Sequence, residues 1–270
     1  MKNENLEKMR ANSLRAAQLK MLGILEEIDA LCKRHKLTYW IEGGTLLGAM
    51  RHGGFIPWDD DLDISMLRPD YERFLEIAAK ELPPHLFLQT RKSDPSFHHR
   101  ESKVRDLNSY IADGDDNNAA DYQKGLFVDV FPYDAGPARF RRQMGKVARG
   151  ITVATVNLNG LHRYSWHSMA RLLYFGVRLP LLQAVWKLGC RLLSDGNHVA
   201  IDPHFAWRCT ICHKQTLFPL REVEFEGRRF PAPHDPDTYL ATLYGNWRQL
   251  PPPDKRQIHS MLILPELIPS

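Results

Sequence analysis

The segment from residue 37 to residue 66 constrains the fold more than any other part of this chain. It reads LTYWIEGGTLLGAMRHGGFIPWDDDLDISM: a short apolar run, a Gly-Gly pair, a helical stretch and a second apolar run that carries acids. Near its end, Leu62, Ile64 and Met66 alternate with polar side chains, which is the period of a β-strand. The segment therefore predicts a strand, a glycine turn, a helix starting near Thr45 and a second strand.

Four aspartates crowd into positions 59–63 of this segment. Because side chains alternate along a strand, Asp61 and Asp63 should share a face, Asp59 would join them if the strand began early, and Asp60 should point elsewhere. Carboxylates held this close repel one another, and Mg²⁺ needs only one or two of them plus substrate phosphates. We therefore predict a site for Mg²⁺, or Mn²⁺, at Asp61 and Asp63.

A third carboxylate is expected from another strand. Asp129 is the single acid in the apolar run LFVDVFP, where a charge is costly unless it is paired or bound to metal. The set of Asp61, Asp63 and Asp129 is thus the predicted metal site, and Asp59 or Asp129 is the candidate base for an attacking hydroxyl. The alternatives are a solvated acidic turn and, for Asp129, a structural salt bridge.

The residues around the acids suit a phosphate group. Gly43 and Gly44 lack a Cβ, so their N–H groups can approach an anion at the start of the helix near Thr45. Gly43, Gly44 and Thr45 are therefore predicted to bind the donor phosphate. Arg51 can clamp a phosphate with two hydrogen bonds. Lys103 and Arg105 lie two apart on an expected strand and share a face, so they could assist. The alternative for these basic residues is an ordinary surface salt bridge.

The order of strand, Gly-Gly, short helix and Asp-x-Asp strand is the layout of nucleotidyltransferase-type palms. We therefore predict an α+β fold, a small mixed sheet with flanking helices, which carries a basic helical insertion. The predicted parts are an N-terminal helix in 1–36, a catalytic core in 37–134, the insertion in 135–200 and a C-terminal α/β part in 201–270.

Further patterns place the remaining elements. We expect helices at 5–36 and 69–80, strands at 85–90, 101–107 and 125–132, a polar loop at 109–125, helices over 137–193 with breaks near 159–160 and at Pro180, and an α/β stretch from 219 to 253.

The formal charge of +4 hides an asymmetry between two parts of the chain. Residues 135–194 contain eight arginines, two lysines and no acid, which leaves a net −6 on the rest. Two interpretations stay open for the helices in 139–192: an amphipathic surface that contacts anionic lipid, or a buried insertion whose arginines face solvent or the acidic lobe. Basic and aromatic residues do not alternate as nucleic-acid stacking platforms do, so no nucleic-acid partner is expected.

The N-terminal segment is charged throughout, and no run of eighteen apolar residues occurs. We expect a cytoplasmic protein, peripheral at the inner face of the cell membrane if the basic helices contact lipid. The segment CTICH at 209–213 has the letters of a haem attachment motif and could form half of a zinc site with His204 or His198. A second Cys-x-x-Cys is absent, which favours buried thiols.

Several of these segments resemble a known family. The stretches GGTLLGAMRHGGFIPWDDDLDI, KVRD, FVDVFP and FEGRRFPAPHDPDTYLATLYGNWRQLPPPDKRQIH are similar to the LicD family, which includes bacterial phosphocholine transferases and is similar to fukutin and fukutin-related proteins. In this resemblance Asp61 and Asp63 match the metal-binding acids, Asp59 matches a further acid beside them, and Asp129 matches the acid of the third strand.

The resemblance implies a nucleotidyltransferase fold and a phospho-alcohol transfer. The donor would be a CDP-alcohol such as CDP-choline, the acceptor a hydroxyl of a glycan or lipid-linked saccharide, and the released product CMP. The acidic residues alone would serve nucleotidyl transfer to a small molecule equally well. A third possibility is a non-catalytic nucleotide- or glycan-binding protein.

Overall fold

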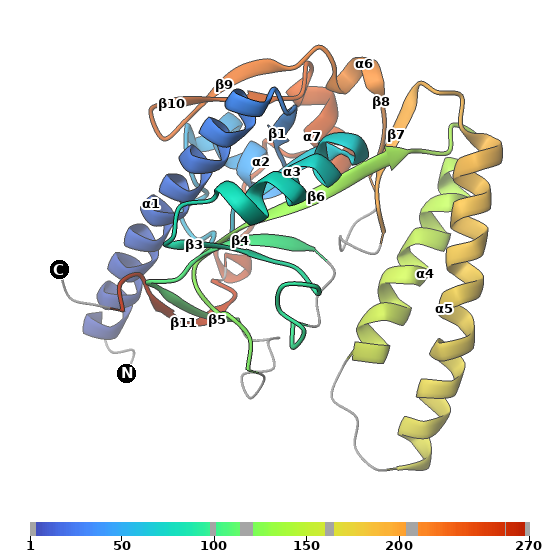
Figure 1. The fold of residues 1–270 in the computed structure, drawn as a ribbon, viewed down its shortest axis with the longest axis horizontal. Helices are drawn as coiled ribbons and strands as arrows, with labels where there is room; N and C mark the ends of the chain where they lie inside the picture. Colours follow the sequence, from blue (N-terminus) through green and yellow to red (C-terminus); the bar gives the residue numbers. More distant parts are fainter. Residues whose placement is uncertain are drawn as a thin grey trace.

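The centre of the fold is a mixed β-sheet. The computed structural model describes residues 4–97, 101–113, 121–159, 165–203, 210–256 and 258–267. Its main sheet has the strand order β1 (Tyr39–Ile41), β2 (Asp63–Leu67), β6 (Phe127–Ala135), β4 (Ser102–Asp106) and β3 (Leu86–Gln89), and β7 (His198–Ile201) and β8 (Ile211–His213) extend it from the end of β6. Among the pairings described, β2–β6 is parallel and the others are antiparallel (Figure 1).

Two helices pack on the central strand β6 and contact each other, α1 (Glu4–His35) and α3 (Arg68–Glu81). In α1, Met21, Leu25 and Ile28 follow helical spacing and are fully buried. Helix α3 begins with a proline in its first turn, where the missing N–H breaks no helical hydrogen bond. These helices supply the hydrophobic support behind the sheet.

Helix α2 (Gly43–His52) contacts β2, α7 (Pro236–Tyr244) and β9 (Arg221–Phe225), which forms a hairpin with β10 (Arg228–Ala232). The side chain of Asp235 caps α7 by accepting from the Thr238 N–H at 3.1 Å. Smaller elements are β5 (Tyr110–Asp113) paired with β11 (Ser260–Leu264), α6 (Lys214–Leu217) and a 3₁₀ turn at Pro253–Lys255. The C-terminal residues therefore return to the catalytic half of the fold.

A helical hairpin, α4 (Arg141–Asn159) and α5 (Trp166–Leu193), leaves the sheet after β6 and returns into β7. It stands to one side of the main body (Figure 1) and has its own small core, in which Met144, Ile151 and Trp186 are buried. At its base, Arg68 donates to Asp134 at 3.0 Å and to Asp202 at 3.0 Å. Within the described residues, no helix combines the length and apolar character needed to cross a membrane.

The mixed sheet with flanking helices confirms the coarse prediction, and four local expectations need correction. The predicted polar loop at 109–125 contains β5, which pairs with a strand far along the chain. Helix α5 runs through Pro180 without ending, because Leu179 and Trp186 on either side of it are buried against α4. The last residues of the predicted insertion form β7 of the main sheet. Helix α2 begins at Gly43 rather than near Thr45.

Candidate active site

Three charged side chains form a row across neighbouring strands. The parallel pairing of β2 and β6 places Asp63 opposite Asp129, and the antiparallel pairing of β4 and β6 places Lys103 opposite Asp129. Residues that are opposite each other in a sheet project their side chains from the same face. The long-range register therefore brings together the two acids predicted from separate sequence segments, and adds Lys103 to them.

Lys103 neutralises Asp129 directly. Its Nζ lies 2.6 Å from Oδ1 and 2.9 Å from Oδ2 of Asp129, and 3.7 Å from the centre of the Phe127 ring. Burial opposes the charge of Lys103, but Asp129 and Glu101 outweigh it and raise its pKa. Lys103 thus remains charged and buried beside the acids. In this structure the partner of Lys103 is Asp129. A contact between Lys103 and a donor phosphate remains a prediction.

The remaining acids repel one another. Burial and then the charges of Asp60 and Asp129 raise the pKa of Asp61 to about 6. Burial and then Asp61 and Asp129 raise the pKa of Asp63. Burial, Asp61 and Asp60 likewise raise the pKa of Asp59, against the opposing effect of Arg51. Burial is the largest cause of all three shifts and the neighbouring carboxylates add to it, so a bound cation would favour the ionised forms.

The two glycines of α2 lie against these carboxylates. Gly43 has φ +52°, and a Cβ there would stand 3.2 Å from Oδ2 of Asp63. A Cβ at Gly44 would stand 3.0 Å from Oδ2 of Asp59. The glycines therefore let the first turn of α2 approach the acids, in a place where the positive end of the helix stabilises them. A phosphate would have to share this place with Asp59 and Asp63.

Thr45 ties α2 to β2. Its Oγ1 accepts the N–H of Asp63 at 2.8 Å, and the N–H of Glu42 donates to the carbonyl of Asp63 at 2.9 Å. These bonds fix the backbone on both sides of Asp63. Thr45 was predicted as a phosphate contact; in this structure its hydroxyl orients the strand that carries the acid.

The chemistry of the donor set fits a hard cation such as Mg²⁺. Carboxylate oxygens are its preferred protein ligands, and two carboxylates suffice where a substrate supplies phosphates. As the side chains stand, no group of three or more His, Cys, Asp or Glu in the described part of the chain is arranged to hold a metal ion. Asp61 and Asp63 are accordingly the fitting pair, since Lys103 already neutralises Asp129.

Asp60 has a different role from the acids beside it, although it lies before β2, where strand alternation does not apply. It is 4% exposed and accepts from the N–H of Ser260 at 2.6 Å and from the Ser260 hydroxyl. These bonds fasten β11 beside the acidic segment. Asp60 is therefore a structural acid, although it lies between Asp59 and Asp61 in the sequence.

Arg51 lies near Asp59 at the end of α2. Its Nη1 donates to the carbonyl of Trp247 at 3.2 Å. Burial and the neighbouring Arg256 lower the pKa of Arg51, and Asp59 and Tyr244 oppose that effect. Arg256 stacks 5.0 Å from the centre of the Trp58 ring. Sequence reasoning missed Arg256, although the basic segment PPPDKRQIH contained the signal.

Arg105 is more deeply buried than its predicted role suggests. It is 2% exposed, and it donates through Nε to Gln89 at 2.5 Å and through Nη1 to the carbonyl of Gly125 at 2.6 Å. Lys103 and Arg105 lie two residues apart on β4, opposite Asp129 and Phe127 of β6. Their side chains therefore share a face, as predicted. A contact between Arg105 and a donor phosphate remains a prediction.

Glu42 is a buried acid that sequence reasoning overlooked. It is 5% exposed, and it accepts from the Tyr239 hydroxyl at 2.7 and 2.8 Å and from the Trp40 indole at 2.9 Å. The hydroxyls of Tyr239 and Tyr133 lie 2.7 Å apart. Burial raises the pKa of Glu42, while these hydrogen bonds oppose the shift. The network joins α7 to β1 directly behind Gly43, and an acid before Gly-Gly was its sequence signal.

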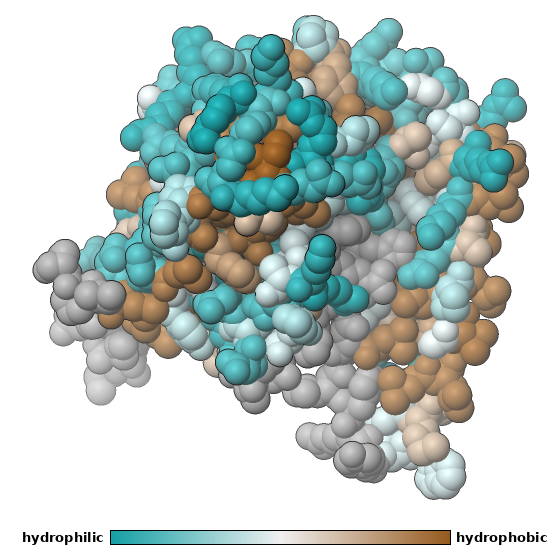
Figure 2. Space-filling model, in the orientation of Figure 1, coloured by the Kyte–Doolittle hydropathy of each residue, from teal (hydrophilic) through white to brown (hydrophobic). Residues whose placement is uncertain are grey.

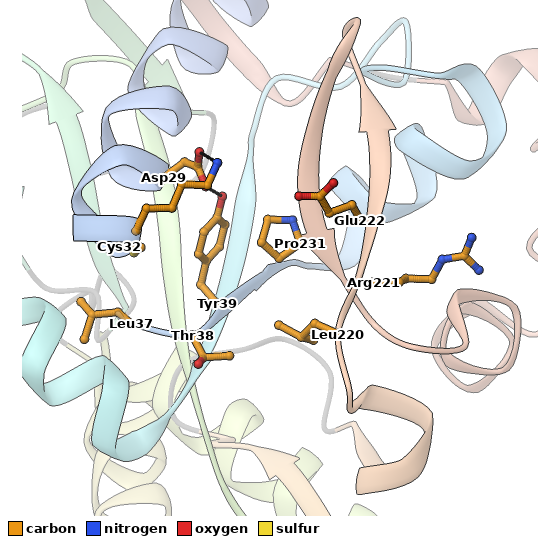
Figure 3. Close-up of a pocket in the computed structure, with 10 residues that line it drawn as sticks. Asp29, Cys32, Leu37, Thr38, Tyr39, Leu220, Arg221, Glu222 and Pro231 are labelled. Atoms are coloured by element: carbon orange, nitrogen blue, oxygen red, sulfur yellow. Dashed lines mark hydrogen bonds and ion pairs between the residues drawn. The ribbon is translucent and has the colours of Figure 1, made fainter. Parts of the chain in front are cut away.

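Two other features lie outside this acidic site. A cavity of about 280 Å³ opens between the end of α1, β1 and the β9–β10 hairpin, and its lining, with Cys32, Tyr39 and Pro231, includes none of the predicted site residues (Figure 3). In the β7–β8 register Cys212 is opposite Val199 while His198 is opposite His213, so Cys212 and His198 face opposite sides. This register does not support the zinc alternative for these two residues, and Cys212 is a buried thiol, as favoured from the sequence. Cys209 and His204 lie outside the described residues.

Comparisons with known proteins agree with this geometry. The family model described as LicD/FKTN/FKRP, nucleotidyltransferase domain, matches residues 36–167, which contain all the acids of the site. Over these residues the chain is similar to the LicD family, as the resemblance of its motifs indicated.

Three relatives illustrate the match. The chain is 29% identical over 272 residues to the lipopolysaccharide cholinephosphotransferase LicD of Haemophilus influenzae, covering 93% of this chain and 97% of that protein. It is 41% identical over 69 residues to human ribitol 5-phosphate transferase FKRP, covering 26% of this chain and 12% of that protein. It is also 41% identical over 84 residues to the uncharacterized protein RP689 of Rickettsia prowazekii, covering 31% of this chain and 29% of that protein.

Proposed function

We propose that this protein is a Mg²⁺-dependent transferase of the LicD type. It moves a phospho-alcohol group, of the phosphocholine kind, from a CDP-activated donor to a hydroxyl of a cell-surface glycan or lipid-linked saccharide, and it releases CMP. The observation that carries the proposal is the set of mutually repelling carboxylates, Asp59, Asp61 and Asp63, beside the Asp129–Lys103 pair. The names of its relatives, a cholinephosphotransferase and a ribitol 5-phosphate transferase, support this choice.

The roles of the residues follow from their positions. Asp61 and Asp63 would hold Mg²⁺ or Mn²⁺, which supplies charge stabilisation for the donor phosphates and the leaving nucleotide. Arg51, with Arg256 beside it, is placed to bind a phosphate oxygen near Asp59. Lys103 opposes the effect of burial, which raises the pKa of Asp129, and its positive charge balances the ionised carboxylate.

Asp59 is the better candidate for the acceptor's proton. Lys103 engages Asp129 and opposes the rise that burial causes in its pKa, whereas burial and acidic neighbours raise the pKa of Asp59 against Arg51 alone. A carboxylate with a raised pKa is a stronger base near neutral pH. The attacking hydroxyl would therefore lose its proton to Asp59 as its oxygen forms the new bond to phosphorus, and the bond to the CMP oxygen breaks.

Nucleotidyl transfer is the second candidate, because the matched family model is described as a nucleotidyltransferase domain. The same residues serve either reaction, and the difference is the phosphorus atom that is attacked. Attack at the phosphorus of the alcohol releases CMP, and attack at the α-phosphorus of a triphosphate releases pyrophosphate. Donor preference therefore separates the two proposals.

Thermal unfolding with a panel of ligands tests the proposal without knowledge of the acceptor. CDP-choline, CDP-glycerol, CDP-ribitol and nucleoside triphosphates are compared with and without Mg²⁺. A ligand at a hundred times its dissociation constant stabilises the protein by about 2.7 kcal/mol. We expect a Mg²⁺-dependent rise with one CDP-alcohol, its loss in Asp61→Asn and Asp63→Asn, and its retention in the exposed control Asp237→Asn.

The other outcomes are equally informative. A rise with triphosphates alone would favour nucleotidyl transfer. An unchanged unfolding temperature with every nucleotide would contradict both catalytic proposals and leave a glycan-binding role.

A further inference from the structure

Helix α5 has two apolar faces, and among the residues that the structure describes only one of them is covered. Leu179, Trp186 and Gly189 are buried where α5 packs on α4. The other face exposes a line of large apolar side chains, each more than half exposed: Trp166, Leu173, Val177, Leu181, Leu188 and Leu192. An ordinary surface helix has a single apolar stripe that faces the core. The second stripe therefore needs a partner outside the hairpin.

The spacing of the exposed residues makes them one continuous stripe. Successive members are seven or four residues apart, which is two turns or one turn of an α-helix. At 100° per residue the stripe lies on the side of α5 that faces away from Leu179 and Trp186. The helix has 28 residues, so the stripe is about 40 Å long. Figure 2 shows hydrophobic surface over much of this hairpin.

Basic residues border the stripe on both sides. At the same 100° per residue, Arg171 and Arg178 lie along one flank, and Lys187 and Arg191 lie along the other. The whole segment 135–194 carries ten basic residues and no acid. An apolar stripe between two basic flanks is the pattern of helices that lie in the interface of an anionic membrane.

We propose that the exposed face of α5 docks the protein on an anionic lipid bilayer. The charge decides between this partner and a second copy of the chain, because two copies meeting at this face would bring two uncompensated basic surfaces together. The hairpin stands to one side of the main body (Figure 1), so the stripe can lie along a membrane while the sheet stays in water. The basic flanks on both sides of the stripe keep α5 in the plane of the interface, with its leucines toward the acyl chains.

Vesicle flotation with the full chain tests this inference, and it does not depend on the proposed activity. Vesicles of phosphatidylcholine are compared with vesicles that also contain phosphatidylglycerol. We expect binding to the anionic vesicles only, and binding that falls with added salt. Leu173→Glu with Leu181→Glu should weaken it by about tenfold or more, because two apolar contacts become charged.

Two controls keep the test decisive. Leu19→Glu, at a leucine that is 50% exposed on α1, should leave binding unchanged. Arg171→Gln with Arg178→Gln should weaken binding without altering the apolar stripe, which covers the case in which the leucine variants fail to fold. Circular dichroism checks the fold of each variant.

Three results would overturn the inference. The first is no binding to anionic vesicles, the second is equal binding to neutral and anionic vesicles, and the third is a stripe-dependent dimer in light scattering without lipid binding. The third result would identify a second copy as the occupant of this face.

Discussion

Replacing Asp61 by asparagine should stabilise this protein while it removes a metal ligand. The pKa of Asp61 is raised from 3.8 to about 6, first by burial and then by Asp60 and Asp129. A shift of this size corresponds to about 3 kcal/mol of unfavourable free energy when the carboxylate is ionised in the folded protein. An asparagine side chain has no charge to desolvate, so the Asp61→Asn variant should be more stable by about 2–3 kcal/mol at pH 8 without metal.

The pH dependence distinguishes charge relief from other causes. Between pH 4 and pH 6 the folded protein holds the Asp61 proton more tightly than the unfolded chain does, so the stability of the wild type falls as pH rises through this window. Below about pH 4 the carboxyl is protonated in both states and the penalty is absent. The gain from Asp61→Asn should therefore be small at about pH 4 and fully developed above about pH 7.

Urea denaturation in a chelator, at about pH 5 and about pH 8, measures both free energies of unfolding. Asp60→Asn is the matched control, because Asp60 accepts two hydrogen bonds from Ser260. It should destabilise by about 1 kcal/mol, since both bonds from Ser260 reach one oxygen and the neutral amide oxygen of asparagine is a weaker acceptor than a carboxylate. A loss of stability in Asp61→Asn equal to that in Asp60→Asn would refute the argument, and so would a gain that is the same at both pH values.

Three other substitutions test separate parts of the site. Tyr239→Phe removes the hydroxyl that donates to Glu42, and should destabilise by about 1–3 kcal/mol in urea; an unchanged midpoint would contradict the network. Lys103→Met leaves Asp129 buried without its partner and should destabilise by about 3–5 kcal/mol, more at pH 8 than at pH 5; a pH-independent loss would argue against charge. Gly43→Ala and Gly53→Ala both strain a positive φ, but only Gly43 has a carboxylate 3.2 Å from the new Cβ. Mg²⁺-dependent donor binding, measured by calorimetry, should therefore fail in Gly43→Ala alone; equal losses would count against the steric argument.

The local patterns of the sequence predicted part of the arrangement around the acids. Period-two alternation set Asp60 apart from Asp61 and Asp63, and Asp60 is bonded to Ser260, but β2 begins only at Asp63, so the strand period does not extend to Asp59, Asp60 and Asp61. The cost of a lone acid in an apolar strand singled out Asp129, which the β2–β6 register places opposite Asp63. The argument for Asp129 rests on a property that a buried strand has wherever it lies in the fold.

What the sequence could not supply were contacts between distant segments. Lys103 and Arg105 share a face as expected, but only the register of β4 and β6 gives Lys103 its partner, Asp129. Glu42 depends on Tyr239, almost two hundred residues away, for its hydrogen bonds. The segment that contains β5 was predicted to be a polar loop. Its partner β11 lies near the C-terminus, so no local pattern could indicate the pairing.

Packing also overrode one local rule. Proline disfavours a helix interior because it lacks an N–H and clashes with the preceding turn. Pro180 nevertheless lies within α5, where buried neighbours on the α4 side hold the helix in place. No pattern in the sequence around Pro180 indicated that α4 would supply this support.

Metal binding with the donor present tests the central claim most directly. Mn²⁺ stands in for Mg²⁺, and electron paramagnetic resonance measures the free ion during titration of the wild type, Asp63→Asn and the control Asp237→Asn, with and without CDP-choline and the other CDP-alcohols. We predict that one CDP-alcohol makes the wild type and Asp237→Asn bind Mn²⁺, and that Asp63→Asn loses this binding. Donor-dependent Mn²⁺ binding that survives in Asp63→Asn, or no binding with any CDP-alcohol, would contradict the account.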